Sequence, residues 1–227
     1  MRPTVLLFDI DGTLITSGTS ARRAIERAFE KHTGRRDAFG FPFDGMTDRA
    51  IVRIALRNIG MDADEAAIDA FLPLYLEVLE DEMAKAPLFR VHHGMERAVD
   101  TARGRDGFAV GLGTGNVKAG AAVKLKRARL HDRFPFGGFG CDHEDRPTLI
   151  RIGAERGAAQ LGVPLAECRV VIIGDTPKDV HAAQAIGAEC IGVGTGHFGP
   201  AQLLACGATR AFRHLGEEGA LEAVLGH

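Results

Sequence analysis

Several common sequence features are missing from this chain of 227 residues. Its four cysteines are widely scattered and contain no CxxC pair, which argues against a zinc site or a disulfide framework and favours a reducing compartment. No apolar run approaches the ~20 residues that span a bilayer, and the N-terminus lacks the basic region and small-residue cleavage site of a signal peptide. We therefore expect a cytoplasmic protein that is neither exported nor embedded in a membrane.

A surplus of charge is also missing. The 28 basic and 30 acidic residues nearly cancel, at a net charge of −2, so the composition does not favour nucleic acid or an anionic membrane as a partner. With 45% hydrophobic and 26% charged residues, the chain is typical of a globular protein that buries a sizeable core. We expect its partner to be a small molecule, and both a monomer and a homodimer are compatible with the sequence.

Apolar runs separated by helical patterns indicate the fold class. Short runs rich in Val, Ile and Leu, each bounded by Gly or Asp, predict buried parallel strands at residues 4–8, 109–112, 169–173 and 189–193. Apolar residues at helical spacing lie between them, in the ranges 95–102, 121–128 and 150–161. Because strand and helix alternate, the sequence predicts an α/β protein with a doubly wound, mainly parallel, Rossmann-like sheet.

Between residues 16 and 86 this alternation stops. Three helical patterns follow one another there, with no convincing strand between them. The second pattern begins after Thr47, a residue type that commonly caps a helix N-terminus. We predict an all-helical cap domain, residues 16–86, inserted after the first strand into a catalytic core formed by residues 1–15 and 87–227.

Two carboxylates and a turn follow the first predicted strand. Asp9 and Asp11 stand at its carboxyl end, which is where ligands bind in an open α/β sheet. Gly12 and Thr13 come next and offer backbone N–H groups suited to holding an anion. A simple Asp-Gly turn is the competing interpretation, and the two motifs that follow disfavour it. The segment therefore combines a candidate nucleophile, a candidate acid and a phosphate cradle.

The next two strands end in groups that suit a phosphate and a metal. Thr114 can donate to a phosphate oxygen beside Gly115 and Asn116, and Asn116 stands where a dinucleotide-binding GxGxxG motif needs glycine. Asp175 and Asp179 follow the third strand. Clustered carboxylates beside a phosphate suit Mg²⁺, which prefers oxygen ligands. A capping box offers a further role for Asp179, and we expect it to serve the metal as well.

With these three motifs in this order, the chain resembles the haloacid dehalogenase-like superfamily of phosphohydrolases, in the branch of phosphoglycolate phosphatase and β-phosphoglucomutase with a helical cap. The resemblance implies that Asp9 attacks phosphorus to form an aspartyl-phosphate, while Asp11 protonates the leaving oxygen and later activates water. It also implies Mg²⁺ held by Asp9, the backbone carbonyl of Asp11 and Asp175, with Asp179 orienting a metal-bound water. A metal is chemically required, because a carboxylate is a weak nucleophile toward an anionic phosphate.

The sequence departs from this family at one cation. Relatives usually place a lysine before the helix that leads to the last acidic strand, whereas this chain has Arg146 there. We expect Arg146 to neutralise the nucleophile and the phosphate, although a planar guanidinium differs from a flexible ammonium. The alternative is that Arg146 is a surface residue and another cation, such as Lys118, fills this role. In the cap, the segment around Thr47 and Arg49 is similar to the loop by which relatives contact the leaving group. Arg49 could contact a second negative group or be a solvated residue.

The motifs leave alternative functions open. A sugar phosphomutase uses the same four acids and differs in the acceptor of the phosphoryl group. Asp11 argues against a hydrolytic dehalogenase, because a halide leaves without protonation. A binding module on an inactive fold is a third alternative, disfavoured because the acids are present. The sequence therefore predicts a Mg²⁺-dependent phosphatase that acts on a small phosphorylated metabolite.

Overall fold

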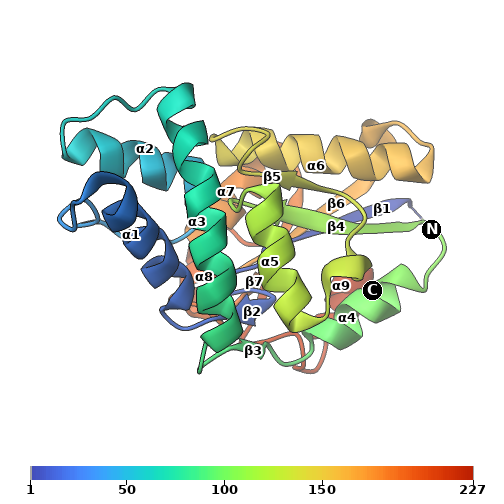
Figure 1. Cartoon of the computed structure of the whole chain (residues 1–227). Helices are drawn as coiled ribbons and strands as arrows, with labels where there is room; N and C mark the ends of the chain where they lie inside the picture. The colour runs from blue at the N-terminus through green and yellow to red at the C-terminus, as the bar shows by residue number, and fades with distance from the viewer. Residues whose placement is uncertain (1, 227) are drawn as a thin grey trace.

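The computed structural model describes residues 2–226, and it contains a central sheet with helices on both faces (Figure 1). The strands lie in the order β5-β4-β1-β6-β7-β8 and all pair in parallel. Their bounds are Thr4–Phe8 for β1, Phe108–Thr114 for β4, Gly137–Phe139 for β5, Arg169–Gly174 for β6, Glu189–Val193 for β7 and Arg210–Phe212 for β8. This architecture confirms the predicted fold class. The edge strands β5 and β8 were not among the predicted strands.

Alternating side chains of β1 show why the sheet needs helices on both faces. Leu6 and Phe8 join one core with α4 (Met95–Arg103), α5 (Lys118–Ala128) and α9 (Ala220–Leu225). Val5 and Leu7 join the other core with α6 (Arg146–Leu161), α7 (Pro177–Ala185) and α8 (Pro200–Ala205). All four side chains are fully buried, as expected for a strand covered on both sides. The short 3-10 helices are His131–Arg133 and Leu165–Glu167.

Three helices form a separate layer after the first strand. They are α1 (Ser20–Thr33), α2 (Asp48–Asn58) and α3 (Glu65–Lys85), and their buried side chains form an apolar cluster of their own. A two-stranded antiparallel ribbon of β2 (Ile15–Thr16) and β3 (Arg90–Val91) lies where the chain leaves and re-enters the core. In Figure 1 the three helices stand together at one side of the sheet, and α3 packs against α5. We call residues 16–86 the cap, and their independence as a domain stays a prediction.

No helix within residues 2–226 is both long and apolar enough to cross a membrane.

Candidate active site

Three buried carboxylates meet at the carboxyl end of the sheet. Asp9 follows β1, Asp175 follows β6, and Asp179 lies in the first turn of α7. Their exposed fractions are 5%, 4% and 0% respectively. One oxygen of each lies within 4.8 Å of the others. The parallel strands β1 and β6 are neighbours, so residues that follow their ends meet at one point.

Arg146 supplies positive charge to this cluster from the first turn of α6. Its Nη2 lies 3.2 Å from Asp9 Oδ2 and 2.6 Å from Asp179 Oδ1, and its Nε donates to the same Asp179 oxygen at 3.0 Å. Asp145 caps this helix by accepting from Thr148 N, which fixes where α6 begins. Nη1 of Arg146 also donates to the carbonyl of Gly45 in the cap, at 3.3 Å. Arg146 is therefore a buried residue of the site.

Burial and mutual repulsion destabilise the ionised forms of these carboxylates. Burial raises the pKa of Asp9 to about 6, although Arg146 opposes the rise. The pKa of Asp175 is raised well above its usual value by burial and by the neighbouring charges of Asp179 and Asp9. One guanidinium cannot neutralise three carboxylates. A divalent cation with oxygen ligands would do so, and the donor set of Asp9, Asp175 and Asp179 fits Mg²⁺.

Close packing of glycine and threonine fixes the position of Asp175. Thr13 donates its hydroxyl to Asp175 Oδ1 at 2.8 Å. A Cβ atom at Gly12 would lie 2.2 Å from Asp175 Oδ2, and one at Gly196 would lie 1.8 Å from the same atom. Gly12 also has φ +82°, which L side chains rarely adopt. Glycine is thus required at both positions for the carboxylate to reach the cluster.

Asp179 has both structural and electrostatic partners. Its Oδ2 accepts from the backbone N–H of Thr176 at 3.0 Å and from the Thr176 hydroxyl at 2.7 Å. The reciprocal contact from Asp179 N completes the capping box that the sequence predicts at the start of α7. Its Oδ1 faces Arg146. Asp179 therefore fixes the helix start and the guanidinium together.

A second cation in the site, Lys124, was missed by the sequence analysis. Its Nζ donates to Asp11 Oδ2 at 2.6 Å and to Asn116 Oδ1 at 2.6 Å. Burial alone would lower the pKa of Lys124, but Asp11 and Asp48 outweigh it and the pKa is raised. Lys124 falls on the buried stripe of α5 with Ala121 and Leu125. A lysine on an apolar stripe was the signal that could have identified it.

The second motif forms a network beneath Asp11. Asn116 Nδ2 donates to Asp11 Oδ2 at 2.8 Å and to Thr114 Oγ1 at 2.9 Å. Thr114 is fully buried. Gly115 and Asn116 line the cavity, whereas Thr114 is not among the residues that line it. The structure therefore brings Asn116 next to Asp11 and uses Thr114 to hold Asn116 in place.

The cap touches this loop through backbone atoms and through the Asp48 carboxylate. Thr47 caps α2 as predicted, accepting from Ala50 N at 3.2 Å. Asp48 N donates to the carbonyl of Gly115 at 2.8 Å, and Val117 N donates to Asp48 Oδ2 at 2.9 Å. A Cβ atom at Gly115 would lie 2.2 Å from the carbonyl oxygen of Met46. The cap loop and the second motif are therefore in direct contact.

Comparison with protein families identifies this arrangement. Residues 3–187 match the model of haloacid dehalogenase-like hydrolases, which is most of the chain. The chain belongs to the haloacid dehalogenase-like hydrolase family. It is thus an enzyme of the hydrolase class, and the resemblance seen in the sequence is confirmed. No curated protein gave a significant match.

Solved structures share the fold of this haloacid dehalogenase-like hydrolase. A predicted phosphatase from Clostridium acetobutylicum has 18% identity and a TM-score of 0.70, with 100% of each chain covered. CbbY from Rhodobacter sphaeroides, in complex with phosphate, has 20% identity and a TM-score of 0.70, covering 98% of this chain and 100% of its own. A candidate β-phosphoglucomutase from Thermotoga maritima has 20% identity and a TM-score of 0.62, covering 98% and 99%. At these identities the likeness concerns the fold.

The cavity of this haloacid dehalogenase-like hydrolase lies between core and cap. Its volume is about 420 Å³. The core contributes Asp9, Asp11, Gly12, Gly115, Asn116, Lys124, Arg146 and Asp175, and the cap contributes residues that include Arg22, Ile25, Phe43, Asp44, Asp48, Ile51 and Tyr75. The acids of the core therefore open into a space whose far wall is made by the cap.

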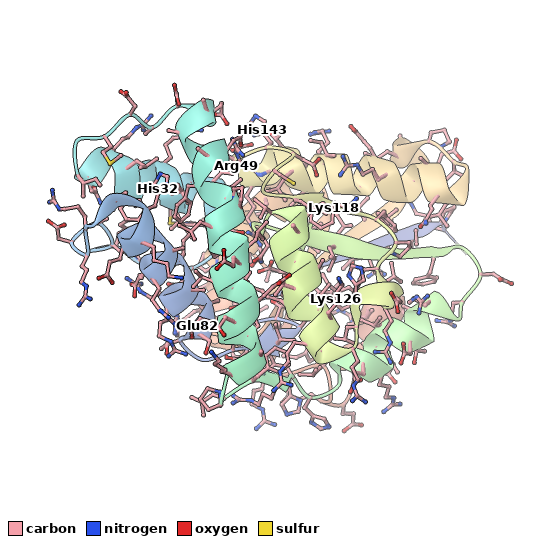
Figure 2. All side chains as sticks on the ribbon, viewed as in Figure 1. His32, Arg49, Glu82, Lys118, Lys126 and His143 are labelled. Atoms are coloured by element: carbon pink, nitrogen blue, oxygen red, sulfur yellow. The ribbon has the colours of Figure 1, made fainter. Side chains whose placement is uncertain are left out.

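Three residues considered from sequence lie outside this cavity. Thr47 is buried at the N-terminus of α2 and is not among the residues that line the cavity. Arg49 forms ion pairs with Glu65 and Asp69 of α3, and it is not among the residues that line the cavity. Lys118 is exposed at the start of α5 (Figure 2). The cap residue that does line the cavity at this point is Asp48. The cap therefore presents the carboxylate of Asp48 to the cavity, and the guanidinium of Arg49 pairs with α3.

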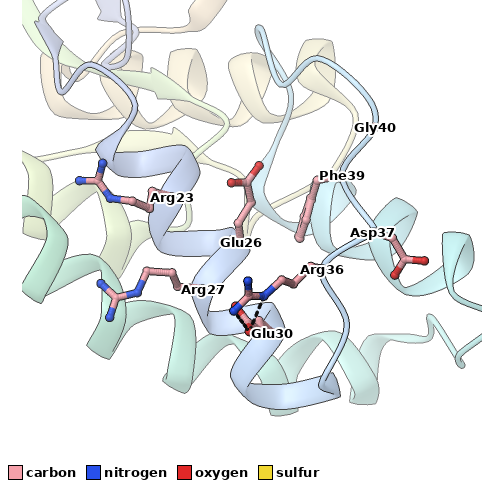
Figure 3. A pocket seen from close by; sticks show the side chains of 8 residues that line it. All are labelled: Arg23, Glu26, Arg27, Glu30, Arg36, Asp37, Phe39 and Gly40. Carbon is pink, nitrogen blue, oxygen red and sulfur yellow. Dashed lines mark hydrogen bonds and ion pairs between the residues drawn. The ribbon is translucent and has the colours of Figure 1, made fainter.

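A larger hollow on the outer side of the cap has a different character (Figure 3). Its volume is about 670 Å³, and α1 and the following loop form its walls. Its arginines face acids: Arg36 pairs with Glu30, and both Arg23 and Arg27 pair with Glu82. It contains no counterpart of the carboxylate cluster among residues 2–226. The carboxylate cluster therefore opens into the smaller cavity and not into this one.

Proposed function

We propose that this hydrolase is a Mg²⁺-dependent phosphatase that cleaves a small phosphate monoester through an aspartyl-phosphate on Asp9. The observation that carries the proposal is the position of Asp9. Its carboxylate is buried beside Arg146 and two further aspartates and opens into the cavity. A carboxylate in this setting suits nucleophilic attack on phosphorus rather than a purely structural role.

The two chemical steps follow from Asp9 and Asp11. In the first, an Asp9 oxygen bonds to phosphorus while the bond from phosphorus to the ester oxygen breaks, and Asp11 gives its proton to the leaving alcohol. In the second, Asp11 takes a proton from water, whose oxygen attacks phosphorus and releases Asp9 and inorganic phosphate. Arg146 offsets the charge on the phosphoryl oxygens throughout. Mg²⁺ held by Asp9, Asp175, Asp179 and the backbone carbonyl of Asp11 would reduce repulsion between nucleophile and phosphate.

The surroundings of Asp11 suit a group that exchanges protons. Its side chain is 40% exposed, in contrast to the buried Asp9, so a leaving oxygen and water can both approach it. Lys124 and Asn116 hold Oδ2. The other oxygen has no partner among the hydrogen bonds of residues 2–226 and is available to the substrate.

Hydrolysis of p-nitrophenyl phosphate, with and without Mg²⁺, tests the proposal. Wild-type protein should release phosphate only with the metal, and Asp9→Asn should abolish turnover while circular dichroism shows an intact fold. Loss of a covalent nucleophile commonly costs at least about a thousandfold in kcat, so residual activity above one part in ~1,000 would refute the role of Asp9. Transfer of the phosphoryl group to a sugar hydroxyl in place of water would identify a phosphomutase.

We also propose that the enzyme is cytoplasmic. All four cysteines are free in the structure. Free thiols are stable in a reducing compartment. The oligomeric state stays a prediction.

A further inference from the structure

Every arginine and lysine that lines the cavity, among the described residues, already has a carboxylate partner. Among residues 2–226, the arginine and lysine side chains that line it are Arg22, Lys124 and Arg146. Arg146 and Lys124 already pair with the catalytic acids. Arg22 donates to Glu26 at 2.7 Å and to backbone carbonyls, and its guanidinium lies 4.2 Å from the ring centroid of Phe43. The charge of Arg22 is thus already paired with Glu26, and three of its five N–H groups are engaged within the cap.

The cap instead contributes carboxylates to the cavity lining. Asp48 is 7% exposed and lines the cavity. Its Oδ2 accepts from Val117 N at 2.9 Å. Within residues 2–226, the only donor to Oδ1 is the Tyr75 hydroxyl at 3.5 Å, which is long for an O–H···O bond. Oδ1 therefore retains the capacity to accept a stronger hydrogen bond from a ligand.

A second cap carboxylate lines the cavity as well. Asp44 lines it and pairs with His197 Nδ1 at 2.5 Å. Lys178 is exposed and packs beside Gly45, outside the set of residues that line the cavity. The cap wall also carries the apolar side chains of Ile25, Phe43, Ile51 and Tyr75, next to polar ones that include Ser17 and Thr19.

We infer that the leaving group is a small, uncharged alcohol that donates a hydroxyl to Asp48 and packs its carbon skeleton against the apolar side chains of the cap wall. This inference rests on the proposed phosphatase function and specifies its substrate class. A carboxylate or second phosphate on the leaving group would face Asp48 across a partly desolvated cavity, where like charges repel strongly. A cavity of about 420 Å³ lies toward the lower end of ligand sites, which span ~300–1,000 Å³, so a leaving group no larger than a monosaccharide fits.

Matched substrates that differ in one group test this inference. 2-Hydroxyethyl phosphate and phosphoglycolate differ only in a terminal alcohol against a carboxylate, as do glycerol 3-phosphate and 3-phosphoglycerate. We expect kcat/KM to favour the alcohol of each pair by about tenfold or more, since like-charge juxtaposition is costly. Where turnover is slow, inhibition constants against p-nitrophenyl phosphate give the same comparison.

An isosteric variant links the preference to Asp48. In Asp48→Asn the amide oxygen can still accept from Val117 N, but the negative charge is gone, so the preference for the alcohol should fall severalfold. Asp81→Asn is the matched control, because Asp81 is an exposed cap carboxylate paired with Lys85. It should keep the wild-type ratio.

The outcomes separate the substrate class from the function itself. A preference for the carboxylate member of each pair, or an unchanged ratio in Asp48→Asn, would overturn the inference while leaving a working phosphatase. Failure to hydrolyse p-nitrophenyl phosphate and all four metabolite analogues with Mg²⁺ would overturn the proposed function, and the inference with it.

Discussion

Lys124 Nζ lies 2.6 Å from Asp11 Oδ2, and only 3% of the lysine side chain is exposed. The site thus has two cations with separate partners: Arg146 contacts Asp9, whereas Lys124 contacts Asp11. Each candidate catalytic acid has its own positive neighbour. This division makes the contributions of the two cations separable by mutation.

Removal of Lys124 should slow the chemical step. In Lys124→Met, Asp11 loses the charged partner that orients it, so we expect kcat to fall by roughly 10²-fold, the lower end of the range for general acid–base catalysis. KM should change little, because Lys124 touches Asp11 rather than filling the cap wall. Steady-state kinetics on p-nitrophenyl phosphate measure both. Lys118→Met provides the control at the exposed start of the same helix, and equal effects of both variants would contradict this role.

Replacement of Arg146 should affect a different part of the reaction. Arg146→Ala removes the guanidinium next to Asp9, and loss of one preorganised donor typically costs about 10²–10³ in kcat. Arg146→Lys should recover part of the rate, since an ammonium restores the charge but cannot reproduce the two contacts with Asp179. A near wild-type kcat in Arg146→Ala would show that the charge beside Asp9 is not needed for phosphoryl transfer.

Mg²⁺ should stabilise the protein through Asp175. If the folded protein alone binds the metal, a concentration of 100 times Kd adds about 2.7 kcal/mol to the free energy of unfolding. Thermal unfolding across a Mg²⁺ titration should show this gain in wild type and lose it in Asp175→Asn. Without metal the variant should be at least as stable as wild type, because ionised Asp175 is costly in its buried position.

The matched control for Asp175→Asn is Asp100→Asn. Asp100 is an exposed carboxylate on α4, outside the cap, and it pairs with Arg133. Its Mg²⁺-dependent gain should equal that of wild type. A metal response that survives intact in Asp175→Asn would remove this residue from the metal site.

Asp48 should make the stability of the metal-free protein depend on pH. Burial raises its pKa from the usual 3.8 to about 6, against the opposing charge of Lys124. The folded state therefore holds the proton on Asp48 more tightly than the unfolded chain does. The resulting contribution to the free energy of unfolding is fully present below pH 3.8 and is lost as pH rises through about 6. At ~1.4 kcal/mol per pKa unit, ionisation costs wild type on the order of 3 kcal/mol.

Asp48→Asn avoids that cost, because an amide stays uncharged. Urea unfolding in EDTA should show the variant gaining stability over wild type at pH 7.5, with the gain shrinking toward pH 4. Asp81→Asn should show no such gain, since Lys85 lowers the pKa of Asp81. A constant difference between Asp48→Asn and wild type across this pH range would be evidence against a buried ionised Asp48.

The meeting of Asp9 and Asp175 was predictable because their positions depend on local patterns. Asp9 and Asp175 directly follow apolar runs that form adjacent strands, so strand order alone brings them together. Lys124 was missed because its burial depends on α3 packing over α5, which no local pattern reveals. The strand β5 (Gly137–Phe139) was missed because it has only three residues, two of them glycine, and so shows no run of apolar side chains.

The cap residues show a further limit of sequence. Asp48 and Arg49 are adjacent in the first turn of α2, where successive side chains point in directions about 100° apart. The sequence places both near the substrate loop, but it does not specify which side of the helix faces the core. Packing decides this: Asp48 lines the cavity, and Arg49 pairs with α3.

The contact between Asp48 N and the carbonyl of Gly115 has an evolutionary consequence. This bond joins two main-chain atoms at a glycine, so it does not depend on the chemistry of the side chains elsewhere on the cap wall, and Asp48 Oδ2 adds one side-chain contact with Val117 N. Phe43 and Ile51 also pack in the apolar cluster of the cap, so we expect these positions to vary among apolar residues while the contact between cap and core is preserved. Such a division allows descendants of one enzyme to diversify in substrate while inheriting the same chemistry.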